Sequence, residues 1–259
     1  MNAPLKRVSI PLLATLAVVV SLGLTVTPGI RAAQAAESPV GLGNAGSFAV
    51  LAATTVTNTG PTTVSGDLGV NPGTAVTGFP PGIVTNGAIH LTDTLSGLAQ
   101  TDLVTAYNDA AGRTPTTTGL TALDGKTLVP GVYSGGALSL GGNLTLNGSA
   151  TGVFIFQASS TLNAGSTSHI LFTGGASACN VFWQVASSAT LQTGADFAGT
   201  IMALTSVTAD TGATITGRLL ARTGGVTMDA NVITRPASCA TSAIGTPATP
   251  VPGRARFTG

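Results

Sequence analysis

Three segments of the chain share one eleven-residue pattern, and the last two begin 18 residues apart. They read VTNTGPTTVSG (56–66), ATLQTGADFAG (189–199) and VTADTGATITG (207–217). Each of the last two continues into an apolar segment, TIMAL (200–204) and RLLAR (218–222). Self-similarity at a short fixed period indicates supersecondary units that bury their apolar sides only by stacking on their neighbours. The repeats therefore predict a β-solenoid.

Apolar and polar residues alternate within each repeat, which is the pattern of a strand with one buried and one exposed side. In the segment 207–217 this places Val207, Ala209 and Ile215 inward and Thr208 outward. The same alternation elsewhere predicts an outward row, which we call the threonine ladder. Its expected members are Thr57, Thr59, Thr145, Thr161, Thr190, Thr208 and Thr227. Because threonine is also an ordinary solvent-side strand residue, the ladder alone does not assign a function.

The second half of each repeat predicts another outward row, on a different side of the coil. Its expected members are Thr63, Ser65, Asp196, Thr214, Thr216 and Asn231. Two polar rows therefore compete as the surface that meets a ligand.

A third side of the coil is predicted to be covered by a helix. Apolar residues recur at three- and four-residue spacing over about 93–112, as in an amphipathic helix. In the segments VFIFQ (153–157) and VFWQV (181–185), the inward and the outward positions of the strand are both apolar. The same holds for TIMAL and RLLAR. Their outward side chains would otherwise form a large exposed apolar patch. The residues expected to meet the helix are Phe154, Phe156, Phe182, Met202 and Leu220.

The chain is predicted to have three parts. Residues 1–35 are typical of a secretory signal peptide, because Lys6 and Arg7 precede an apolar run and Ala33-Gln34-Ala35 offers a cleavage site. A retained membrane anchor is the alternative; no later segment is long and apolar enough to cross a bilayer. Residues 36–236 form the solenoid domain. Residues 237–259 are rich in Ala, Thr and Pro and are expected to be a disordered tail.

Charge and cysteine usage agree with a secreted binding protein. Loss of Lys6, Arg7 and Arg31 leaves seven of the ten Lys and Arg residues, against nine Asp and Glu. Nucleic acid is not an expected partner, because the sequence has no basic patch that would attract the phosphate backbone. Cys179 and Cys239 form an even pair, for which a disulfide is the default in an oxidising compartment. Two buried free thiols are the alternative.

Residues for catalysis or metal binding are sparse. The only two histidines, His90 and His169, lie far apart, and neither has a partner at metal-ligand spacing. Asp210 and Asp229 are expected on one row and Asp196 on another, which disfavours a row of Ca²⁺ ligands. Polysaccharide hydrolases, which also use solenoids, need paired carboxylates at one cleft. We therefore expect no enzyme activity, no cofactor and no metal.

A rigid grid of threonines suits ordered water as a ligand. Stacked strands lie about 4.8 Å apart, and alternate residues of one strand lie about 6.6 Å apart. Each threonine presents a methyl and a hydroxyl group at a χ1 angle that β-branching restricts. Because such an array is already ordered, little entropy is lost when it binds an ice-like water layer.

The chain resembles the microbial ice-binding protein family over nearly its whole mature length. The resemblance rests on LGNAGSFAVLAATTVTNTG (42–60), on GDLGVNPGTAVTGFPPG (66–82), and on 178–236, in which VFWQV, GTIMALTSVT and GRLLAR follow in this order. It implies an all-β fold, a right-handed β-solenoid of roughly triangular section with one long α-helix along one face. It also implies that the first coil closes against the last ones.

The resemblance further implies ice binding through one flat face that carries a Thr-(Ala/Gly)-x-(Thr/Asn) motif. Thr208 to Thr211 and Thr211 to Thr214 match this motif, and Thr193 to Asp196 matches it in part. We therefore expect a secreted, monomeric protein that binds ice through the threonine ladder extended to Thr211 and Thr214. The second row is the alternative surface. The alternative function is a cell-surface structural or adhesive module, which could bind glycans.

Overall fold

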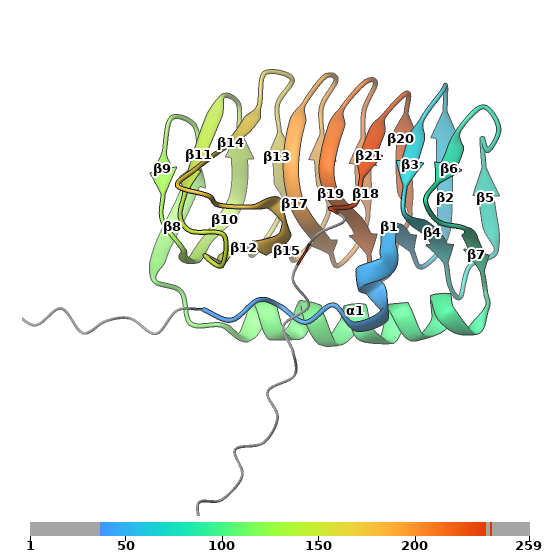
Figure 1. Ribbon diagram of the computed structural model, residues 1–259, viewed down its shortest axis with the longest axis horizontal. Coiled ribbons are helices and arrows are strands. Elements are labelled where there is room, and N and C mark those ends of the chain that lie inside the picture. Colours follow the sequence, from blue (N-terminus) through green and yellow to red (C-terminus); the bar gives the residue numbers. More distant parts are fainter. Residues whose placement is uncertain (1–36, 237–238, 240–259) are drawn as a thin grey trace, which may run out of the picture. The chain divides into compact units, whose positions relative to one another are not determined.

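The computed structural model describes residues 37–236 and Cys239, all within one compact unit. The predicted signal peptide, and the predicted tail apart from Cys239, lie outside the described residues. Parallel strands stack coil upon coil, and helix α1 (Thr94–Gly112) runs along one side of the stack (Figure 1). The predicted β-solenoid with a flanking helix is thereby confirmed. Within the described residues, no helix is both long and apolar enough to cross a membrane.

The coils present three faces. The helix face, which α1 covers, consists of β8 (Thr117–Ala122), the first half of β10 (Gly131–Leu140), β12 (Phe154–Ala158), β15 (Val181–Val185), the second halves of β17 (Asp196–Ala203) and β19 (Thr214–Ala221), β1 (Phe48–Ala52), β4 (Asp67–Val70) and β7 (Ile89–Leu91).

The next face along each coil is the threonine face. It consists of the second half of β10, then β13 (Leu162–Ala164), β16 (Ala189–Leu191), β18 (Val207–Ala209), β20 (Val226–Asp229), β2 (Thr55–Thr59) and β5 (Ala75–Thr77).

The third face closes the triangle. It consists of β9 (Thr127–Leu128), β11 (Asn143–Asn147), β14 (His169–Thr173), the first halves of β17 and β19, β21 (Val232–Thr234), β3 (Thr63–Ser65) and β6 (Ile83–Thr85). Two short 3₁₀ helices, η1 (Gly43–Ser47) and η2 (Ala178–Asn180), precede β1 and β15.

The coils do not stack in chain order. The first coil lies between the last coil and the second one, because β1 pairs with both β19 and β4, and β2 pairs with both β20 and β5. From β7 the chain returns along α1 to the other end of the solenoid and starts again at β8 (Figure 1). The closure of the first coil against the last, which the family resemblance implies, is therefore present.

The interior of the solenoid is a continuous apolar core with a line of aromatic rings. Phe156 and Trp183 stack with their ring centroids 4.0 Å apart, and Trp183 lies 5.1 Å from Phe197. The indole Nε1 of Trp183 donates to the carbonyl oxygen of Ala198 at 3.0 Å, so its polar atom is satisfied inside the core. These rings come from successive coils on parallel strands, and they fill the triangular section.

Helix α1 begins because Asp93 caps it, the carboxylate accepting from the backbone N–H of Ser96 at 2.8 Å. Its buried side, with Ala99 and Leu103, packs on outward side chains of the helix face, including Phe182, Met202 and Leu220. The expected helix contacts were wrong at two positions: Phe154 and Phe156 belong to the interior core, and Ile155 faces the helix. Because both sides of this strand are apolar, the sequence alone could not show which side chains point into the core and which toward the helix.

Tethers hold both ends of the described chain to the body. Arg113, which follows α1, bonds with Glu37 at 3.0 Å and with Asp109 at 2.8 Å, so it ties the segment before η1 to the helix. The expected disulfide joins Cys179 to Cys239, with a Cα–Cα distance of 5.1 Å. It links the residues after β21 to η2.

Glycines at the corner between the third face and the helix face let β17 and β19 pass from one face to the other. A Cβ atom at position 217 would overlap the carbonyl oxygen of Gly199 in the neighbouring coil. We predict that Gly217→Ala lowers the free energy of unfolding by about 1–3 kcal/mol, because the coils would have to separate locally. Thermal unfolding followed by circular dichroism measures this loss.

The matched control is Gly136→Ala, because a Cβ atom there meets nothing within 4 Å. It should change stability by no more than about 0.5 kcal/mol. Equal stability of the two variants would contradict the close packing of coils at this corner.

Candidate functional site

The threonine face carries one straight row of small polar side chains from β10 to β5, and in the end coil Ala122 of β8 lies opposite the first residue of the row. Backbone pairing places these residues in register, each on the strand next to the previous one. All point away from the interior and are exposed or half-buried. In stacking order the row is Ser139, Asn163, Thr190, Thr208, Thr227, Thr57 and Thr77. We call it the central row.

The structure places four of the predicted ladder residues in the central row: Thr57, Thr190, Thr208 and Thr227. Thr161 directly precedes β13 and so lies beside the row on the same face. Thr59 ends β2 opposite Asp229, on the side of the face towards the third face. Sequence reasoning missed Thr77 as a member of the row, and in the segment 160–166 it aligned Thr161, instead of Asn163, with Thr190. Their register on β13 and β5 could have been found by aligning LNA (162–164) with ATL (189–191) and AVT (75–77) with TVT (55–57).

The predicted ladder was wrong at Thr145. This residue lies on β11 of the third face, opposite Thr127 and Leu171. Alternation with period two says which residues point outward, but not which side of a triangular coil they occupy. Thr145 therefore cannot share one flat surface with Thr208.

The proposed extension of the ladder to Thr211 and Thr214 also crosses a corner. Thr214 opens β19 on the third face, opposite Asp196 and Val232. Thr211 lies in the turn between the two faces, next to Gly212 with its positive φ of 73°, and its hydroxyl bonds to the Asp229 carboxylate. The motif that joins these threonines in sequence therefore runs around the edge of the threonine face.

The third face holds most of the predicted second row but is less uniform than the threonine face. Thr63, Asp196 and Thr214 are in register with Val232, which is 48% exposed, and with Ile83, which is 52% exposed. Ser65 and Thr216 lie in the parallel row. The Asp196 carboxylate lies 3.5 Å from His169, so a charged group occupies the middle of the face. Protruding apolar and charged side chains make this face rougher.

Asn231, which the sequence placed in the second row, is fully buried. Its Nδ2 donates to the carbonyl oxygens of Asp210 at 2.8 Å and Ala213 at 3.3 Å, and its Oδ1 accepts from the backbone N–H of Asp229 at 2.7 Å. The expectation that it faces solvent was therefore wrong. The amide instead fastens the turn between the threonine face and the third face, and so fixes the edge of the threonine face.

Charge on the threonine face is confined to that edge. Asp210 and Asp229 each lie two residues beyond a threonine of the central row, next to the turn that Asn231 holds. Gln192 at the equivalent position donates to the amide oxygen of Asn163 at 3.2 Å. The central row itself consists of hydroxyl and amide side chains, so no strongly hydrated charge interrupts it.

The opposite edge of the face is also internally bonded. The Ser188 hydroxyl accepts from the backbone N–H of Ser206 at 3.4 Å, and the Ser206 hydroxyl accepts from the backbone N–H of Gly225 at 3.3 Å. These side chains link each coil to the next. The face is thus held at both edges by hydrogen bonds between coils, which keeps the central row straight.

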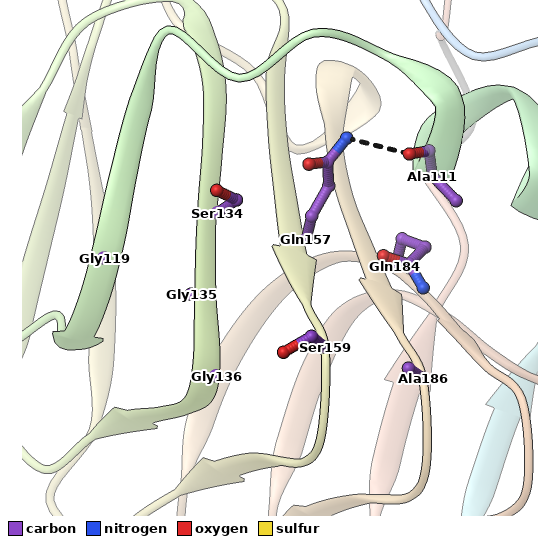
Figure 2. A pocket seen from close by; sticks show the side chains of 9 residues that line it. All are labelled: Ala111, Gly119, Ser134, Gly135, Gly136, Gln157, Ser159, Gln184 and Ala186. Carbon is purple, nitrogen blue, oxygen red and sulfur yellow. Dashed lines mark hydrogen bonds between the residues drawn. The ribbon is translucent and has the colours of Figure 1, made fainter.

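Other parts of the described chain offer little for chemistry. No group of three or more His, Cys, Asp or Glu residues there could hold a metal ion. A hollow of about 490 Å³ beside the end of α1 is lined by glycines, serines and two glutamines, as Figure 2 shows. The Gln157 amide there donates to the carbonyl oxygens of Ala110 and Arg113, both at 2.8 Å. These contacts close the C-terminal end of the helix, and none of the residues that line the hollow is titratable.

Known proteins are similar to this chain in sequence and in fold. The family model described as "Ice-binding-like" matches residues 50–234. An ice-binding protein of Nostoc sp. (strain HG1) is 46% identical over 198 residues, which are 74% of this chain and 72% of that protein. One from Colwellia sp. is 36% identical over 76% of this chain and 84% of its own length.

Solved structures agree. An ice-binding protein from an Antarctic biological consortium matches with a TM-score of 0.74 at 43% identity, over 78% of this chain and 93% of that one. One from the Antarctic ascomycete Antarctomyces psychrotrophicus matches with a TM-score of 0.73 at 42% identity, over 76% and 98%. The chain belongs to the ice-binding-like family of β-solenoid proteins.

The buried amide of Asn231 gives a direct test of how the edge of the threonine face is held. We predict that Asn231→Ala lowers the free energy of unfolding by about 1–3 kcal/mol, because it leaves buried backbone groups of Asp210, Ala213 and Asp229 without this partner. Chemical denaturation measures the loss. Asn143→Ala, at an exposed residue on the third face, is the control and should be nearly neutral. A neutral effect of Asn231→Ala would remove this residue as the support of the edge.

Proposed function

We propose that this protein binds ice through the threonine face, with the central row at the middle of the contact. The observation that carries the proposal is the in-register row of small polar side chains that runs without a break from Ser139 to Thr77. Family membership supports the ligand, since relatives with this fold are named ice-binding proteins. The third face is the less suitable surface, because Val232, Ile83 and the His169–Asp196 pair interrupt it.

The physical basis of binding is a lattice that is ordered before ice arrives. Adjacent strands place threonines of the central row about 4.8 Å apart, and β-branching limits each side chain to few rotamers. Hydroxyl groups order water by hydrogen bonding, and the methyl groups beside them exclude bulk water. Each contact is weak, but all residues of the row engage together, so the summed affinity is high.

Adsorbed molecules would block growth of the ice surface between them, so the expected activities are inhibition of recrystallisation and shaping of crystals. We propose that the protein acts outside the cell as a monomer and that it is a binder, without enzyme activity. The signal-like sequence at residues 1–35 supports export. A cell-surface module that lacks ice activity is not favoured, because the relatives that match most of the chain are named for ice binding.

Replacement of one central residue by a large side chain tests the surface. We predict that Thr208→Tyr reduces inhibition of ice recrystallisation by about tenfold or more, because the ring lifts the face away from the ice and prevents simultaneous engagement of the row. The measurement is the growth of ice grains over time as a function of protein concentration.

The matched control is Thr216→Tyr, an exposed threonine on the third face between Ala198 and Thr234. It should leave activity unchanged, and both variants should unfold at the temperature of the unmodified protein. Loss of activity in Thr216→Tyr alone would assign ice binding to the third face. If both variants lose activity while the unmodified protein is active, ice binding cannot be assigned to one face alone.

A further inference from the structure

A hollow of about 670 Å³ lies on the side of the solenoid away from the threonine face, next to α1 and the disulfide. Its wall combines the segment before β1, the middle of α1, residues of η2 and β15, and Arg235, Pro236 and Cys239. Two arginines line it, Arg218 from β19 and Arg235 from the segment that follows β21. The residues of the ice-binding proposal do not contribute to it.

Arg218 is a buried cation whose hydrogen bonds to described residues all go to neutral groups. It is 4% exposed, and its Nε and Nη2 donate to the carbonyl oxygen of Gly46 at 3.2 and 3.0 Å. Its Nη1 donates to the hydroxyl of Thr200 at 3.2 Å. A buried guanidinium is ordinarily paired with a carboxylate, yet Arg218 forms no salt bridge within residues 37–236 or with Cys239. Two of its five N–H groups have no hydrogen-bond partner in the part of the chain that the structure describes.

Arg235 adds a second positive charge to the same hollow. Its Nε is buried and has no hydrogen-bond partner among the described residues. Burial lowers the pKa of Arg218 to about 10, and the nearby charge of Arg235 contributes to this shift. Arg218 is still protonated at neutral pH, and among the described residues neither guanidinium group forms a salt bridge.

The rest of the wall suits an apolar body. Val40, Leu42 and Phe182 line the hollow together with the Cys179–Cys239 disulfide. Asp102 is also present, but its Oδ2 accepts from the backbone N–H and the side-chain amide of Asn44, both at 2.7 Å. Its carboxylate is therefore hydrogen-bonded to the loop of η1, and neither arginine forms a salt bridge with it.

We propose that this hollow binds a small organic anion, with its carboxylate held by Arg218 and Arg235 and its apolar part against Phe182 and the disulfide. Guanidinium groups bind carboxylates through two parallel N–H···O bonds, and a site shielded from water strengthens such bonds. The anion would offset one of the two positive charges and link the loop of η1 to the end of the solenoid. It would therefore stabilise the folded state, and the stabilisation would grow with the logarithm of its concentration once the site is saturated.

Benzoate is a suitable probe, because it joins one carboxylate to one apolar ring, and benzamide is its uncharged isostere. Calorimetric titration of the full chain should show saturable binding of benzoate and binding of benzamide weaker by about tenfold or more. Thermal unfolding should move to higher temperature with benzoate alone. Inorganic phosphate, which lacks the apolar part, should bind less tightly than benzoate.

Arg235→Gln should weaken benzoate binding by about tenfold or more, since it removes one charge-assisted partner. The matched control is Arg222→Gln, at an arginine that lies over the ring of Tyr107 at 4.5 Å and does not line the hollow; it should bind benzoate as the unmodified protein does. Absence of benzoate binding to the folded protein at millimolar concentration would overturn the proposal. Equal binding of benzamide, or full binding by Arg235→Gln, would overturn it as well.

Discussion

Parallel, in-register pairing between successive coils is the constraint on which every other feature of this protein depends. Because each strand bonds to the equivalent strand of its neighbours, any residue type that recurs in the repeat becomes a straight row on the surface. The same pairing stacks Phe156 on Trp183 in the core. The repeat thus directly produces a surface that is regular over the length of the solenoid. The only other requirement is that hydrogen bonds between coils hold the edges of the face.

The order of the coils explains why an all-β body carries a long helix. The first coil pairs with the last, so the chain must return from β7 to the far end before it can wind back to meet itself. Helix α1 makes this return and also covers the one face whose outward side chains are apolar, among them Met202 and Leu220. The two polar faces remain free for a ligand. Their difference in roughness, rather than in hydroxyl content, favours the threonine face.

Sequence reasoning predicted the solenoid and the helix because both leave periodic signals, the repeat of 18 residues and the three-to-four spacing of apolar residues. It failed where the answer depends on the corners of the coil. Thr145 and Thr214 alternate correctly but lie around a bend, and Asn231 turns inward to bond a neighbouring coil. Alternation within one strand contains no information on bends between strands. The sequence likewise could not predict that Arg218 and Arg235 are neighbours, because the closure of the chain brings the two together.

Ice binding by the intact surface of this protein can be measured directly. Its most direct test is the partitioning of the fluorescently labelled protein, without residues 1–35, into an ice hemisphere grown slowly from dilute solution. Fluorescence is expected throughout the ice, whereas a labelled protein of similar size without affinity for ice stays in the liquid. Exclusion of the folded protein from the ice would contradict the account, because a rigid row of this length that meets the ice surface should be incorporated as the crystal advances.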